Sequence, residues 1–321
     1  MSLLDIKHVN ITYKVGKKRI YAVQDACLEI DPQDAVGIVG ESGSGKSTLA
    51  MGILRLISDQ IADIDGEAVF DGQNLLSLTP DQLNARRWKD IAVVFQKSMN
   101  ALSPVHRIGR QMEDIYHIHM PHASRQEAQK RILELFRIVN LSERVYQSFP
   151  HELSGGMMQR VSIALSLMFN PRLLVMDEAT TALDVVTQGQ ILREIMDLQA
   201  SMKLTRIMIT HDVSVVASTC NKVAVMYAGQ MLETGDVRDV LVHPKHPYTQ
   251  GLMKSFPSFT GEKSELRGIP GSLPDLSVKP TGCVFAPRCP YATEQCRTCA
   301  PQMKTVGDKW NVACHMAGGE A

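Results

Sequence analysis

One short stretch constrains the fold of this chain more than any other: Gly40-Glu41-Ser42-Gly43-Ser44-Gly45-Lys46-Ser47-Thr48. It follows the apolar run 35–39 and leads into a helix-compatible segment from Leu49. This order is typical of a phosphate-binding loop, because glycines let backbone N–H groups turn toward phosphate oxygens and the helix N-terminus attracts anions. Lys46 then supplies a charge for the β- and γ-phosphates, and Ser47 supplies a hydroxyl ligand for Mg²⁺. The stretch therefore predicts a nucleoside triphosphate site.

Length and charge narrow the class of protein. A chain of 321 residues is long enough for two or three structural units. Lys plus Arg and Asp plus Glu both number 34, so no nucleic-acid partner is expected. No apolar run approaches the ~20 residues that span a bilayer, and the first residues do not look like a signal peptide. We expect a cytosolic protein whose membrane role, if it has one, comes through partners.

The segment before the loop reads as strands at 4–9 and 21–30, and another strand is expected at 66–72. Tyr13 lies among them. Its ring could stack on an adenine face, although a strand tyrosine is also common as simple packing. Residues 79–87 read as a helix with Thr79 as N-cap and Pro80 at its first position.

The next segments alternate between buried strand and helix. The apolar run 91–95 predicts a parallel strand that ends at Gln96, and a polar amide at that edge is placed where open α/β sheets hold ligands. Residues 100–145 show helical spacing, as at Ile132, Leu135 and Phe136, and predict an all-helical insertion.

Two further stretches carry chemistry. In the first, Ser154 precedes Gly155 and Gly156 and an apolar helical stripe, which fits either a second anion site at a helix N-terminus or a flexible hinge. The second is a buried strand, 173–178, that ends in Asp177 and Glu178. Asp177 can hold Mg²⁺ through its water shell, and Glu178 can polarise a water for in-line attack.

The core is expected to finish with three elements. After a helix at about 187–202, the apolar strand 206–210 ends at His211, which could donate to a γ-phosphate or be an ordinary polar residue. Residues 222–235 then read as a hairpin around Ala228-Gly229, which we expect to close the core.

The order and separation of these motifs resemble the ATP-binding subunit of an ABC transporter over about residues 1–250. The resemblance rests on six motifs, which correspond to the Walker A, Q-loop, signature, Walker B, D-loop and H-loop sequences: 40–47, Gln96, 153–160, 173–178, Ala182-Leu183-Asp184 and His211.

The resemblance implies a role for each motif. Tyr13 stacks on adenine, while Ser47 and Gln96 approach Mg²⁺. Glu178 is the general base, and His211 contacts the γ-phosphate. The signature residues Ser154 and Gly156, with Gly155 between them, serve ATP bound by the opposite subunit. The helical insertion is the surface that grips the permeases.

This sequence departs from the usual family pattern at two positions. Met157 stands where many members have glutamine, although methionine is familiar in the peptide-importer branch. Ala179 stands where proline usually follows the Walker B glutamate, which leaves open how rigidly the turn after Glu178 is held.

The C-terminal region resembles the extension of dipeptide, oligopeptide and nickel importer ATPases. The matching segments are 247–249, 269–271 and 282–290. In that branch a quartet of cysteines can hold a [4Fe–4S] cluster, and the quartet maps onto Cys283, Cys289, Cys296 and Cys314, with Cys299 left over.

Chemistry alone leaves the metal open. A cytosolic location disfavours disulfides, and four thiolates suit either tetrahedral Zn²⁺ or an iron–sulfur cube. The C-x5-C-x6-C spacing lacks the tight knuckle of zinc ribbons, whereas Cys296 and Cys299 form one C-x2-C that keeps zinc possible. Free thiols are the third alternative.

We therefore expect an α/β protein with a P-loop NTPase (RecA-like) core, an antiparallel β subdomain, a helical subdomain at about 97–157 and a cysteine-rich extension at 251–321. Its predicted function is ATP hydrolysis that energises an importer of peptides or related solutes. Expected partners are a second, paralogous ATPase, two permeases and an extracytoplasmic binding protein, which would place the chain at the cytoplasmic face of the membrane. The alternative is a soluble ABC ATPase that acts on nucleic acid or ribosomes.

Overall fold

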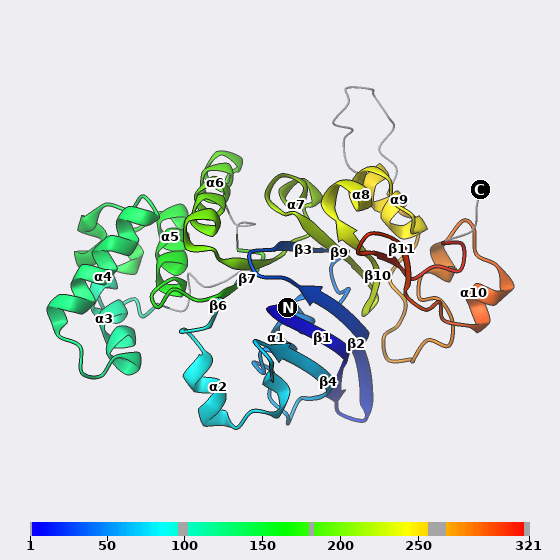
Figure 1. Ribbon diagram of the computed structural model, residues 1–321, viewed down its shortest axis with the longest axis horizontal. Helices are drawn as coiled ribbons and strands as arrows, with labels where there is room; N and C mark the ends of the chain where they lie inside the picture. The colour runs from blue at the N-terminus through cyan, green and yellow to red at the C-terminus, as the bar shows by residue number, and fades with distance from the viewer. Residues whose placement is uncertain (1, 96–101, 180–182, 256–267, 318–321) are drawn as a thin grey trace. The chain divides into compact units, whose positions relative to one another are not determined.

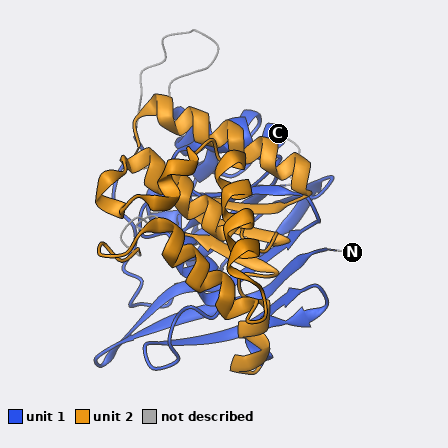
Figure 2. Ribbon diagram, turned by 90° about the vertical axis from the view of Figure 1, so that its left-hand side faces the viewer, with its two compact units in different colours: residues 1–78, 209–321 blue, residues 79–208 orange. Residues whose placement is uncertain are grey.

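The computed structural model describes residues 2–95, 102–179, 183–255 and 268–317 (Figure 1). They form two compact units (Figure 2): unit 1 comprises residues 1–78 and 209–321, and unit 2 comprises residues 79–208. Within the described residues, no helix has both the length and the apolar character needed to cross a membrane.

Unit 1 contains two sheets and several short helices. Its elements are β1 (Leu4–Val15), β2 (Lys18–Ile30), β3 (Ala35–Val39), α1 (Lys46–Ile53), β4 (Ala62–Phe70), β5 (Gln73–Asn74), η1 (Leu75–Ser77), α7 (Val213–Thr219), β9 (Lys222–Tyr227), β10 (Gln230–Asp236), α8 (Val237–Val242), α9 (Pro247–Lys254), η5 (Ala286–Arg288), α10 (Glu294–Thr298), β11 (Lys304–Gly307) and β12 (Trp310–Val312).

The first sheet of unit 1 is antiparallel, in the order β2-β1-β4-β5. β1 and β2 pair from Leu4 with Ile30 to Val15 with Lys18, so both strands extend beyond the predicted apolar cores. Most of the extra residues are polar or exposed, but Ile11 among them is fully buried, so the apolar pattern marks these strands only in part. The three predicted strands of this sheet are otherwise confirmed.

The second sheet of unit 1 runs in the order β11-β12-β10-β9-β3. β3 is parallel to β9 and entirely buried, which matches its predicted role as the strand before the phosphate loop. The predicted hairpin is confirmed as β9 and β10, joined through Ala228 and Gly229 with φ values of 48° and 83°. The expectation that this hairpin closes the core was wrong, because β12 pairs with β10 and adds the C-terminal tail to the sheet.

The tail, residues 268–317 of the described chain, packs into the same hydrophobic core as the strands of unit 1. Val284 and Phe285 are buried in one cluster with Tyr227 and Tyr248. The Phe285 ring lies edge-on to that of Tyr227, with ring centroids 5.3 Å apart. The tail is therefore part of the hydrophobic core of unit 1. Aromatic pairs of this geometry also contribute stability beyond their buried area.

Unit 2 carries the helical insertion (Figure 2). Its elements are α2 (Pro80–Arg86), β6 (Ile91–Val94), α3 (Ile108–His119), α4 (Arg125–Ile138), η3 (Glu143–Gln147), η4 (Pro150–Glu152), α5 (Gly155–Ser166), β7 (Leu173–Asp177), α6 (Val185–Met202) and β8 (Thr205–Ile209).

The predicted helical character of residues 100–145 is confirmed for the described residues from 102 onward. On α4, Ile132, Leu135 and Phe136 are fully buried, as their spacing predicts. The N-cap prediction for Thr79 also holds, because its side chain accepts from the Gln82 N–H in a capping box. β6 and β7 pair in parallel, as their continuous apolar runs indicate.

Candidate nucleotide-binding site

The backbone of the phosphate loop requires glycine at two positions. Gly40 has φ of 150°, and a Cβ there would meet the carbonyl oxygen of Met226 at 2.0 Å. Gly45 has φ of 100°, and a Cβ there would meet the carbonyl oxygen of Ala22 at 2.4 Å. Both obstacles are backbone atoms of neighbouring strands, so a side chain could be admitted only by moving the sheet.

Lys46 is buried with its ammonium group against the loop. Its Nζ donates to the carbonyl oxygens of Gly40 at 2.8 Å and Glu41 at 2.9 Å. It also lies 3.3 Å from the Oγ of Ser44, which is itself fully buried. The loop thus curls around a positive charge, and a phosphate entering it would share that charge with the loop carbonyls.

The N-terminus of α1 adds to the positive potential of the loop. Its N-cap is Gly45, which has no side chain to cap the first N–H groups, and the first turn contains no acidic residue. Ser47 and Thr48 lie in that turn and are half-buried, while Ser42 and Gly43 form the exposed rim of the loop. Backbone N–H groups at such an end, together with the helix dipole, favour an anion.

Two contacts that the sequence does not reveal hold the loop in place. The Gly229 N–H of the β9–β10 turn donates to the Ser44 carbonyl at 2.9 Å, and the hydroxyl of Tyr248 on α9 accepts from the Glu41 N–H at 3.0 Å. Both partners lie about two hundred residues further along the chain. No local pattern predicts either contact, although Gly229 lies in the predicted turn and Tyr248 lies in the segment 247–249 that resembles the importer extension.

The predicted catalytic acids end β7 in unit 2. Asp177 is buried, with 6% of its surface exposed. Glu178 is half-buried and has a left-handed φ of 46°, followed by the buried Ala179. Ala179, which replaces the proline usual in the family, is thus a buried residue. Gln96 and Ala182 lie outside the described residues.

His211 follows β8 and belongs to unit 1. It is exposed, and the preceding Thr210 N–H donates to the Ile38 carbonyl at 3.2 Å. That bond ties the segment leading to His211 to β3, the strand before the phosphate loop.

The signature residues begin α5 in unit 2. The Oγ of Ser154 accepts from the Met157 N–H at 3.3 Å, so the predicted N-cap is confirmed. Ser154 and Gly155 are exposed, and the first turn carries no acid. Gly156 is crowded, because a Cβ there would come within 2.7 Å of the Thr187 side chain. The arrangement is a helix N-terminus open to solvent.

Asp184, the acid of the D-loop motif, caps α6. Its carboxylate accepts from the N–H groups of Thr187 at 3.0 Å and Val186 at 3.1 Å. Hydrogen bonds from Thr187 hold the pKa of this carboxyl below its usual value. A charged Asp184 therefore fixes the start of α6.

The four cysteines of the predicted quartet line one small cavity in the tail, whereas Cys299 is exposed and does not. Burial raises the pKa of the Cys283 and Cys289 thiols, and Cys296 and Cys314 are buried beside them. Neutral thiols grouped in this way ionise readily only when a cation compensates their charge. The donor set is one of soft sulfur ligands, which fits zinc or an iron–sulfur group.

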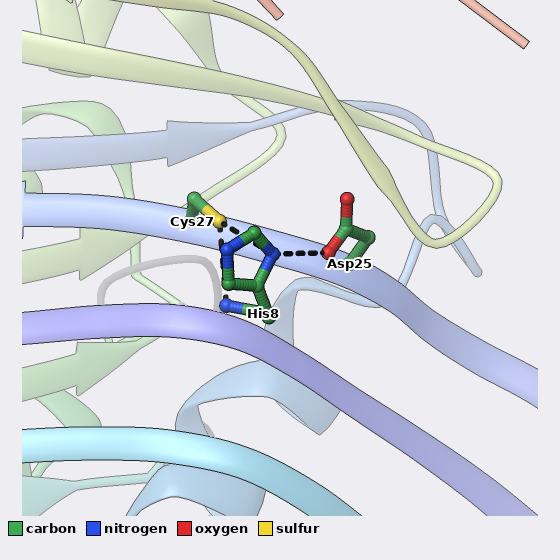
Figure 3. A group of neighbouring side chains, drawn as sticks. All are labelled: His8, Asp25 and Cys27. Atoms are coloured by element: carbon green, nitrogen blue, oxygen red, sulfur yellow. Dashed lines mark hydrogen bonds and ion pairs between the residues drawn. The ribbon is translucent and has the colours of Figure 1, made fainter. Parts of the chain in front are cut away.

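One other cluster has mixed ligand chemistry (Figure 3). His8, Asp25 and Cys27 place their ligand atoms within 4.8 Å of one another, and among the described residues this is the grouping that could enclose a single ion. Asp25 Oδ1 lies 2.7 Å from His8 Nδ1, and both side chains are about three-quarters exposed. Their mutual hydrogen bonds account for the geometry, so we assign no ion to them.

Comparison with known proteins agrees with this geometry. The family model described as "ABC transporter" matches residues 23–181, and that described as "Oligopeptide/dipeptide transporter, C-terminal region" matches residues 232–296. A probable peptide ABC transporter ATP-binding protein of Sinorhizobium fredii is 43% identical, over 97% of this chain and 94% of that protein. The dipeptide transport ATP-binding protein DppD of Haemophilus influenzae is 39% identical, over 98% and 96%.

Solved structures show the same fold. The ATP-binding cassette MJ0796, in a dimeric post-hydrolysis state bound to ADP and Pi, superposes with a TM-score of 0.66 at 32% identity. The match covers 73% of this chain and 99% of that one. With the phosphate loop, the acids that end β7 and a relative matched over nearly the whole chain, this protein belongs to the family of ABC transporter ATP-binding proteins.

Proposed function

We propose that this chain hydrolyses ATP to energise an importer of dipeptides, oligopeptides or related solutes. The observation that carries the proposal is the phosphate loop, in which a buried Lys46 is held against the loop carbonyls beside the open N-terminus of α1. The C-terminal match to a peptide-transporter region and the names of the relatives support the class of solute.

The ATP-binding residues are assigned by geometry and by family resemblance. The loop from Gly40 to Lys46 binds the phosphates, with Thr48 on the first turn of α1. Ser47 and Gln96 are the ligands proposed for Mg²⁺, and Asp177 would hold the ion through water. When bound, Mg²⁺ would neutralise negative charge on the β- and γ-phosphates.

Hydrolysis requires a base and a donor. We assign Glu178 as the residue that takes a proton from the attacking water, and His211 as a donor to the γ-phosphate. The left-handed backbone at Glu178 and the exposed position of His211 are compatible with these roles.

The catalytic site is proposed to be shared between two ATPase subunits. Ser154, Gly155 and Gly156 would contact ATP held by the other subunit, which we expect to be a paralogue. Their support is an exposed helix N-terminus with no acid in its first turn, which suits an incoming phosphate.

Importer ATPases work with membrane proteins. We propose that the helical insertion, about 97–157, binds two permease subunits and that the chain sits peripherally at the cytoplasmic face of the membrane. An extracytoplasmic binding protein would deliver the solute. The ATPase domain is assigned to 1–250 and the extension to 251–321.

We propose that the tail quartet Cys283, Cys289, Cys296 and Cys314 holds a metal centre, a [4Fe–4S] cluster in preference to zinc. The support for a centre is that all four cysteines line one cavity, and the preference for a cluster rests on the resemblance to the importer extension. The tail contributes only a small hydrophobic cluster of its own, so such a group would brace it.

Reconstitution tests the function. ATPase activity should rise when the chain is assembled with its permeases and supplied with a peptide-loaded binding protein. Stimulation by nucleic acid or ribosomes instead would favour the soluble alternative. ATPase activity indifferent to all of these additions would exclude a transport role.

A further inference from the structure

Arg288 of the tail is buried against the phosphate loop. Only 6% of its side chain is exposed, and its guanidinium donates to the carbonyl oxygens of Ile269 at 2.9 Å and Pro270 at 2.8 Å. One terminal nitrogen contacts both carboxylate oxygens of Glu41, at 2.9 and 3.0 Å, and the Tyr227 hydroxyl at 3.2 Å. The charge also lies 5.5 Å from the Tyr227 ring centroid, within cation–π range.

Glu41 is the second residue of the phosphate loop and is held through each of its polar groups. Its N–H donates to the Tyr248 hydroxyl, its carbonyl accepts from Lys46 at 2.9 Å, and its carboxylate pairs with Arg288. Arg288 therefore contacts the same residue whose carbonyl holds the phosphate-binding lysine.

The ion pair between Arg288 and Glu41 affects nucleotide binding because Glu41 carries a negative charge beside the phosphate site. A carboxylate in a phosphate loop repels the phosphates it should help to receive, unless a cation compensates it. A buried guanidinium in turn requires a carboxylate partner, because leaving either charge alone is costly. The pair thus supplies a neutral, rigid anchor at a place where Glu41 by itself would oppose ATP.

We propose that Arg288 is a positioning residue for ATP binding: by pairing with Glu41 it fixes the phosphate loop and cancels the charge that would repel the triphosphate. The tail thereby sets the affinity of the nucleotide site without touching the nucleotide. This inference rests on the proposed function, because it requires that the loop bind ATP.

The test is a double-mutant cycle in the full-length chain, with Arg288→Gln, Glu41→Gln and the double variant. Equilibrium binding of a fluorescent ATP analogue gives the affinity, and KM and kcat are measured in the assembled transporter. Arg288→Gln should weaken binding about tenfold, because it leaves Glu41 unpaired, with kcat changed less than about twofold. In the Glu41→Gln background, the same change should alter affinity by less than about twofold.

Two readouts separate this role from a general loss of structure. Added salt should restore part of the affinity of Arg288→Gln, since it screens the repulsion by Glu41. Arg288→Lys should recover part of the affinity, because it keeps the charge but not the fork of donors. The matched control is Arg297→Gln, which changes an exposed tail arginine and should leave binding as in the unmodified protein.

The outcomes are distinct. Equal losses from Arg288→Gln in both backgrounds, or unchanged affinity in the folded single variant, would overturn the positioning role. If Arg288→Gln does not fold, Arg288→Lys takes its place in both backgrounds: its loss of affinity should disappear in the Glu41→Gln background, and an equal loss in both would overturn the role. Failure of the unmodified chain to bind the analogue would instead refute the proposed function.

Discussion

The hydroxyl of Tyr13 lies 3.4 Å from the Oγ1 of Thr48, so an aromatic residue of β1 contacts the first turn of the helix after the phosphate loop. The two residues come from different elements of unit 1, and Tyr13 is half-buried. This contact brings the Tyr13 side chain to the helix that follows the phosphate loop, and we propose that its ring stacks on the base of a nucleotide held there.

Tyr13→Ala should therefore weaken ATP binding by about tenfold, in line with the energy of base–aromatic stacking. Tyr13→Phe should bind ATP nearly as well as the unmodified chain, because stacking requires the ring and not the hydroxyl. Titration with the fluorescent analogue measures both. Equal losses in the two variants would show that the contact with Thr48, and not stacking, matters.

Glu178→Gln should bind ATP but hydrolyse it at least about 100-fold more slowly in the assembled transporter, because the amide cannot accept the proton of the attacking water. Lys46→Ala should instead weaken nucleotide binding itself, which makes it the matched contrast. Steady-state phosphate release and nucleotide retention separate the two effects. Near-full activity of Glu178→Gln would remove Glu178 from the role of base.

The isolated chain should hydrolyse ATP slowly and accelerate when the partner ATPase is added, because part of each site comes from the other subunit. Gly155→Asp should abolish that acceleration. The added Cβ has room, with Leu183 at 3.9 Å, and an acid at a helix N-terminus favours the helix while it repels an incoming phosphate. Gly189→Asp, also in open space, is the control. Full activity of a strictly monomeric chain would exclude the shared site.

Cys314→Ser should lose the metal of the tail, whereas Cys299→Ser should keep it, because Cys314 lines the common cavity and Cys299 does not. Protein purified without oxygen should be brown and carry about four irons per chain. Metal analysis and visible absorbance of each variant check this. Colourless protein with zinc would establish the alternative ion, and iron loss in Cys299→Ser alone would change the ligand assignment.

Acid should weaken the attachment of the tail at Asp31. Hydrogen bonds from Lys309 at 2.8 Å and Lys222 at 3.0 Å lower the pKa of this carboxyl to about 2. Because the pKa is lower in the folded protein, the pairing stabilises fully above the unfolded value near 4, and this contribution is lost as pH falls toward about 2.

Asp31→Asn should consequently lower the urea midpoint near neutral pH, and the difference from the unmodified chain should shrink as pH falls to about 3. Asp308→Asn, at an exposed position in the same region, is the control and should show no such convergence. A difference that stays constant with pH would mean that Asp31 acts through packing and not through its charge.

Much of the fold followed from local sequence. The buried runs predicted β3, β6 and β7, and the cap residues Thr79 and Ser154 predicted where helices begin, because both signals depend on neighbours within a few residues. The tail strands β11 and β12 were missed, since they are only four and three residues long, too short for a clear strand pattern. Nothing near them in sequence indicates pairing with β10.

The residues of the candidate site also fall into those that the local sequence predicts and those that it does not. The loop glycines, Lys46 and the acids that end β7 are marked by spacing, whereas Arg288 and Glu41 lie 247 residues apart and have no shared pattern. The family resemblance predicted which four tail cysteines act together, and all four line one cavity. Their spacing alone did not decide between zinc, an iron–sulfur cluster and free thiols.

The pairing of β12 with β10 also bears on how this extension can change over evolution. Glu233 and Thr234 of β10 face Val312 and Asn311, and the matched C-terminal family region begins at residue 232, inside that core strand. Deleting the tail would leave the backbone donors and acceptors of β10 as an exposed edge, which invites pairing with other chains and aggregation. A protein that lost this extension would therefore need another segment to pair with or cover the exposed edge of β10.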